Sequence, residues 1–90
     1  MPEIISAEYV DGYKVRVHFN NGESGVVDLE EALWGPVFEP LRDVNVFKKF
    51  EVSDVFHTIT WENGADLAPE YLYDKMAEQT AAHGHAEASR

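Results

Sequence analysis

The feature that most constrains the fold is an alternating stretch enclosed by two turn signals. In residues 13–20, YKVRVHFN, every second side chain is apolar: Tyr13, Val15, Val17 and Phe19. A period of two is typical of a β-strand with one buried face. Asp11-Gly12 precedes the stretch and Asn21-Gly22 follows it, and both dipeptides favour tight hairpin turns. The pattern predicts a three-stranded antiparallel meander with strands at 3–10, 13–20 and 23–28.

The two turns also set an expected register for the meander. Two-residue turns would place Ser6 opposite Val17, and Val17 opposite Val26. Ala7 and Val27 would then lie beside Arg16, which leaves the outer face of the sheet half apolar. A β-bulge would change this register.

Short helices are predicted in the middle of the chain. Residues 29–34 suit one or two helical turns that Asp28 caps, and Glu31 completes the spacing of a capping box. Residues 43–50 suit a second short helix, capped by Asp43.

The last part of the domain reads as two strands followed by a helix. Residues 51–56 and 58–61 are strand candidates joined near His57. Pro69 is well placed at the first position of a helix that we expect to run to about residue 80. The negative charge of Glu70 would interact favourably with the positive, N-terminal end of the helix dipole. The fold class is therefore α+β, with a small antiparallel sheet, short helices and a C-terminal helix.

The size and composition suit one packed domain. We assign residues 1–80 to a single domain and residues 81–90 to a disordered polar tail. The absence of cysteine excludes disulfides and thiolate sites. The sequence has no signal peptide and no apolar run of the length of about 18 residues that spans a membrane. We therefore expect a cytoplasmic protein without a membrane partner.

The charge of the chain bears on its partners. Seventeen acids against seven bases give a net charge of −10. Such a chain repels the phosphates of nucleic acids and anionic lipids. It favours a basic protein partner, although acidity also serves solubility alone.

Two stretches resemble a known family. They are FNNGESGVVDL, residues 19–29, and WENGADLAPEYLY, residues 61–73, and they resemble the bacterial domain-of-unknown-function family 2442. The resemblance covers about residues 3–74. It implies a small α+β domain and brings no known activity or cofactor.

The resemblance also implies two contexts. Some members look like N-terminal domains fused to a helix-turn-helix domain. Others look like free-standing proteins encoded beside a small partner, in suspected toxin–antitoxin pairs. The last predicted helix leaves no room for a helix-turn-helix after it, so we expect the free-standing kind.

Asp66 is the acid whose role is least obvious. A structural role would have its carboxylate accept hydrogen bonds from the turn and from the start of the helix. A functional role would make it a general base or a partner contact. In the structural case, Asp66→Ala should lower the free energy of unfolding by about 1–3 kcal/mol.

The tryptophans, histidines and bases offer further candidates. Trp61 suits the core, with a role as an interface anchor as the alternative. For Trp34, packing against the domain and contact with a partner are equally expected. His83 and His85 lack a third ligand, so we expect no metal site. A basic stripe, formed by Lys14, Arg16 and His18, could bind an anion, but cross-strand acids more often balance such a stripe.

Two functional hypotheses follow. The first is a non-enzymatic protein-interaction module, antitoxin-like or regulatory, that binds a basic partner. The second is a small-ligand-binding or enzymatic domain with a site around Asp66, Glu70 and Tyr71. The candidate partner surface consists of Trp34, Trp61, Asp66, Glu70 and Tyr71. The expected turn and cap residues are Gly12, Gly22, Asp28, Gly64, Asp66 and Pro69. No catalytic motif and no cofactor signature is present.

Overall fold

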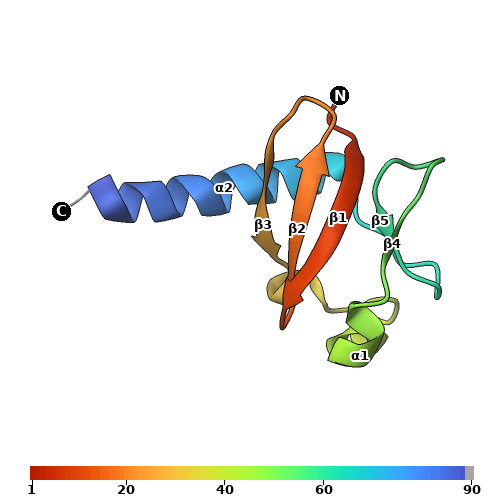
Figure 1. Cartoon of the computed structure of the whole chain (residues 1–90). Helices are drawn as coiled ribbons and strands as arrows, with labels where there is room; N and C mark the ends of the chain where they lie inside the picture. The colour runs from red at the N-terminus through yellow and green to blue at the C-terminus, as the bar shows by residue number, and fades with distance from the viewer. Residues whose placement is uncertain (89–90) are drawn as a thin grey trace.

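The computed structural model describes the backbone of residues 1–88 and the side chains of residues 1–79. It confirms the α+β class. The main sheet is antiparallel, in the order β1-β2-β3, and is formed by β1 (Ile4–Asp11), β2 (Lys14–Phe19) and β3 (Ser24–Asp28) (Figure 1). The remaining elements, in chain order, are η1 (Glu30–Ala32), η2 (Glu39–Arg42), α1 (Val44–Phe47), β4 (Glu51–Val52), β5 (Ile59–Thr60) and α2 (Pro69–Ala88). The strands β4 and β5 form a separate antiparallel pair.

The register of the meander differs by one residue from the predicted one. Val17 lies opposite Ala7 on one side and Gly25 on the other, where Ser6 and Val26 were expected. A shift by one residue exchanges the two faces of a strand. The observed register therefore brings the buried residues of neighbouring strands onto the same face of the sheet.

Bulges and a longer loop cause this shift. β1 has an irregularity on each side of residues 6–9. The second loop leaves residues 20–22 between Phe19 and Glu23, and the Phe19 N–H donates to the Glu23 carbonyl at 2.8 Å. Gly22 has a φ of 89°, which a residue with a side chain rarely adopts.

Helix α2 covers the inner face of the sheet (Figure 1). It begins at Pro69 as predicted, and Leu72 and Met76 are buried beneath it. A Cβ atom at Gly25 would lie 2.9 Å from Met76 Cγ, so this glycine lets the helix approach β3 closely. The helix continues to Ala88, beyond the predicted end near residue 80. The predicted disorder of residues 81–90 concerns residues whose side chains lie outside the described part, and it stays a prediction.

An aromatic cluster fills the space between the sheet and α1. Phe47 is its centre, with ring centroids 5.4 Å from Tyr13 and 5.8 Å from Trp61. The Trp61 Nε1–H donates to the Phe47 carbonyl at 2.8 Å. Asp43 caps α1 as predicted, because its Oδ1 accepts from the Asn45 N–H at 2.9 Å.

The predicted capping box at Asp28 is wrong. Asp28 Oδ1 accepts from the Glu30 N–H at 3.0 Å, so the carboxylate does hold the start of η1. The Glu31 carboxylate does not accept the reciprocal hydrogen bond from the Asp28 N–H that a capping box requires. It lies instead 3.6 Å from the Lys75 ammonium on α2. The Asp28 N–H instead donates to Gln79 Oε1 at 3.0 Å.

The second strand pair is shorter than predicted. The Ser53 hydroxyl accepts from the N–H groups of Val55 and Phe56 at 3.1 and 3.0 Å, which turns the chain away from β4. His57 then has a φ of 55°. Over the described residues, no helix combines the length and the apolar character needed to cross a membrane.

Candidate functional site

An apolar groove lies between the segment that follows η1 and the first turns of α2. Its volume is about 430 Å³. Apolar and glycine residues form most of its lining: Ala32, Trp34, Gly35, Pro36, Val37, Phe38, Leu67 and Tyr71. Glu31 adds a carboxylate to this lining. We call this feature the Trp34 groove.

The backbone that carries Trp34 is held from two sides. The Arg42 Nη1–H donates to the Leu33 carbonyl at 2.9 Å, just before Trp34. The Asn63 Nδ2–H donates to the Val37 carbonyl at 2.9 Å, just after it. Leu33 is fully buried while Trp34 is 75% exposed. The indole is therefore presented to solvent on a segment that hydrogen bonds from Arg42 and Asn63 hold in place.

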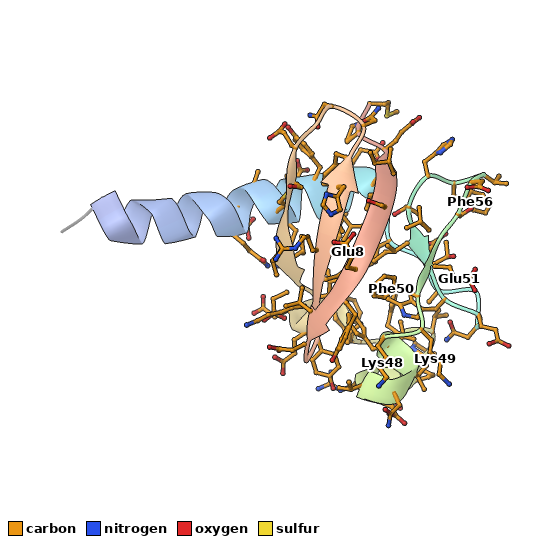
Figure 2. The ribbon with its side chains drawn as sticks, viewed as in Figure 1. Glu8, Lys48, Lys49, Phe50, Glu51 and Phe56 are labelled. Carbon is orange, nitrogen blue, oxygen red and sulfur yellow. The ribbon has the colours of Figure 1, made fainter. Side chains whose placement is uncertain are left out.

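An exposed indole beside a concave apolar surface is unfavourable in water. Burial of apolar surface contributes roughly 25 cal/mol per Å², so covering Trp34 and the groove would be favourable. Exposed apolar patches of this kind mark interaction sites. A second exposed aromatic, Phe56, is 64% exposed and lies at the outer end of the loop that joins β4 and β5 (Figure 2).

Carboxylates gather around the groove, η1 and α2. We call this set the acidic flank: Glu23, Asp28, Glu30, Glu31, Glu70, Asp74 and Glu78. Glu31 links it to the groove, because this residue also lines a small surface hollow with Asp28, Glu30 and Gln79. Among the described side chains of α2, Lys75 is the one base, and it is paired with Glu31. Lys48 and Lys49 lie beside α1, away from α2 (Figure 2).

The structure brings together only some of the predicted partner-surface residues. Trp34 and Tyr71 both line the groove, and Tyr71 is 39% exposed. Asp66 and Glu70 are exposed, but neither lines the groove. Trp61 is 5% exposed and belongs to the core. Sequence reasoning missed Val37 and Phe38, for which the neighbouring Gly35-Pro36 turn was the available signal.

The turn before α2 is organised by Asn63 and not by the Asp66 carboxylate. Asn63 Oδ1 accepts from the Ala65 N–H at 3.1 Å, as an Asx turn requires. The buried Thr58 hydroxyl donates to the Leu67 carbonyl at 2.5 Å. Among the described residues, none donates a hydrogen bond to the Asp66 carboxylate. The Asp66 backbone forms an isolated bridge with Thr60.

This geometry reverses the expectation for Asp66→Ala. We now expect the free energy of unfolding to change by less than about 0.5 kcal/mol, as at other exposed positions. Asn63→Ala should lower it by about 1 kcal/mol or more, because the Ala65 N–H and the Val37 carbonyl both lose a partner. Urea denaturation of both variants tests this. A larger loss for Asp66→Ala than for Asn63→Ala would contradict the assignment.

The basic stripe is balanced by cross-strand acids. Glu8 lies opposite Arg16, and its Oε1 is 3.0 Å from His18 Nε2. Lys14 lies opposite Asp11 and Asp28. The described residues contain no group of three metal-ligating side chains. His83 and His85 fall outside the side chains that the structure describes.

Tyr73 ties α2 to the second hairpin loop. Its hydroxyl donates to Glu23, which also accepts from Asn21 Nδ2 at 2.7 Å. The hydrogen bond to Glu23 raises the pKa of Tyr73 above its ordinary value. The neutral phenol is therefore favoured in the folded state. This stabilisation is complete below the ordinary tyrosine pKa and is lost as the pH rises through the raised value.

We expect Glu23→Gln to lower the pKa of Tyr73 toward the usual value of about 10. The measurement is tyrosinate absorbance against pH, with Tyr73→Phe used to identify the contribution of this residue. An unchanged titration in Glu23→Gln would show that Glu23 does not control the phenol.

The sheet, the strand pair and the C-terminal helix define a small α+β domain. The family of this domain follows from its sequence. The family model described as "Protein of unknown function (DUF2442)" matches residues 4–78. The chain therefore belongs to this family, which confirms the resemblance carried by the two motifs. No curated protein and no solved structure matches the chain.

Proposed function

We propose that this domain is a protein-interaction module that binds a basic protein partner through the Trp34 groove. The observation that carries the proposal is Trp34 itself, 75% exposed on a backbone fixed by Arg42 and Asn63. Tryptophan dominates binding energy at interfaces when a partner covers it. A rigid presentation lowers the ordering cost of binding.

Charge selects the kind of partner. Glu31 of the acidic flank lines the groove, Asp28 and Glu30 share a hollow with it, and the chain carries a net charge of −10. A basic partner would be attracted and oriented by this surface, whereas nucleic acids and anionic membranes would be repelled. The balanced basic stripe on the sheet supports the same preference.

We infer an antitoxin-like or regulatory member of a cytoplasmic two-protein pair, with no catalytic activity and no cofactor. The alternative of a ligand or enzyme site around Asp66, Glu70 and Tyr71 receives no support from the geometry. Of these three residues, only Tyr71 lines the groove.

The test is affinity capture from an extract of the native host at low salt, with bound proteins identified by mass spectrometry. Wild type should retain one dominant basic protein that salt releases, since salt screens exposed charges. Trp34→Ala should lose it. Phe56→Ser is the matched control, because it removes another exposed aromatic and should retain the partner. Equal capture by wild type and Trp34→Ala would disprove the role of the groove.

A further inference from the structure

The outer edge of β3 presents backbone groups to solvent. β3 is an outer strand of its sheet. The Leu29 N–H donates to the Tyr13 carbonyl at 2.9 Å, and the Phe19 N–H donates to the Glu23 carbonyl at 2.8 Å. These two hydrogen bonds show which residues of β3 bond to β2. The backbone N–H and C=O groups of the odd-numbered residues of β3 point toward β2. Those of Ser24, Val26 and Asp28 therefore point away from it.

Gln79 already occupies one of these three positions. The Asp28 N–H donates to Gln79 Oε1 at 3.0 Å, and Gln79 Nε2 donates to the Asp28 carbonyl at 3.2 Å. One side-chain amide thus makes the pair of bonds that a neighbouring strand would make. Within the described part of the chain, nothing does the same for Ser24 or Val26.

Among the described residues, the opposite edge of the sheet is interrupted along its length, whereas this edge is blocked at Asp28 alone. β1 carries two irregularities, and its Ile4 N–H donates to the His57 carbonyl at 2.8 Å. β3 has a continuous register with β2 and contains no proline or lysine. Proteins normally block free edges with such devices, because an open edge pairs with another strand. An open edge of this kind is suited to recognition by strand addition.

The surroundings of the edge indicate its occupant. Glu23 and Asp28 flank the free positions, and the hollow lined by Asp28, Glu31 and Gln79 shares Glu31 with the Trp34 groove. Helix α2 passes behind the sheet and continues beyond β3, so it forms a ledge beside the edge (Figure 1). An added strand would lie between this ledge and solvent, with the carboxylates of Glu23 and Asp28 at its two ends.

We propose that an extended, lysine- or arginine-rich segment of the partner adds to the sheet as a strand along β3, through the backbone groups of Ser24 and Val26. This inference rests on the proposed function, because it specifies how the basic partner is recognised. The basic side chains of the segment would face the acidic flank, and the backbone bonds would fix its register.

The probe for this test is the acetylated and amidated peptide Lys-Val-Lys-Val-Lys, titrated into the labelled full chain by NMR. We expect saturable shifts at the Ser24 and Val26 amides. Val26→Pro should weaken binding about tenfold or more, because it removes an N–H that faces away from β2 and leaves the ladder intact. The same peptide methylated on the amide nitrogens that face β3 tests the intact protein, in case Val26→Pro fails to fold.

Controls separate this inference from the proposed function. A Glu-Val-Glu-Val-Glu peptide should not bind, and Trp34→Ala should bind the lysine peptide like wild type, since the peptide has no anchor for the groove. Shifts confined to the groove would overturn the strand addition while leaving the groove proposal standing. The absence of saturable shifts at Ser24 and Val26, or full binding of the methylated peptide, would also overturn it.

Discussion

Trp61→Ala is expected to lower the free energy of unfolding by about 3–5 kcal/mol, the usual range for a large buried side chain. Trp61 is 5% exposed and packs on Phe47 and Phe50, with ring centroids 5.8 and 6.3 Å away. Its removal leaves a cavity in the cluster that joins the sheet to α1. It also leaves the buried Phe47 carbonyl without the indole donor. Because small domains are stable by only about 5–15 kcal/mol, a large part of the stability is lost.

Urea denaturation followed by circular dichroism measures this loss. Trp61→Phe is the informative companion, because it keeps an aromatic ring while it removes the indole N–H and part of the ring volume. Its cost should be smaller, about 1–3 kcal/mol. If Trp61→Ala costs less than about 1 kcal/mol, the cluster repacks around the gap and Trp61 does not hold α1 to the sheet.

The meander could be predicted because its signals are local. Alternation in residues 13–20 specifies one buried face, and the glycines at 12 and 22 allow the turns. Asp43 was recognised as a cap for a similar reason, since the side chain binds a backbone group two residues away. Each of these features is decided within a few residues of the chain.

The register was wrong because it depends on packing that short-range signals do not report. Turn chemistry favours two-residue loops, but those loops place Val17 opposite Ser6 and Val26. The native arrangement accepts bulges in β1, which bring Ala7 beside Val17, and a three-residue loop at 20–22, which brings Gly25 beside Val17 on the face that α2 covers. Burial of that face outweighs ideal turn geometry.

The candidate site was recovered in part for related reasons. Both tryptophans are equally apolar in the sequence, and only the tertiary structure decides that Trp61 is enclosed and Trp34 is not. Asp66 was assigned the structural role in the turn that Asn63 has, since both residue types form such bonds. The second contact of Asn63, to the Val37 carbonyl, joins segments far apart in the chain and leaves no local signature.

Trp34→Ala is expected to weaken binding of the basic partner by about 2 kcal/mol or more, which is about thirtyfold, and to leave the fold unchanged. The expectation follows from the combination of high exposure and fixed backbone. Removing an exposed side chain costs the folded state little, so the free energy of unfolding should stay within about 0.5 kcal/mol of wild type. In the complex the same side chain would lie at the centre of the apolar contact.

Calorimetric titration of the captured partner into wild type and Trp34→Ala measures this effect, with urea denaturation of both proteins beside it. Tyr71→Phe is a graded control, because it keeps the ring that lines the groove and should bind within a few-fold of wild type. Raised salt should weaken wild type and Trp34→Ala by the same factor, since the acidic flank is intact in both. A salt dependence that disappears with the indole would instead show that Trp34 positions the charged contacts. Unchanged affinity of Trp34→Ala would remove the groove from the interface and leave charge as the source of recognition.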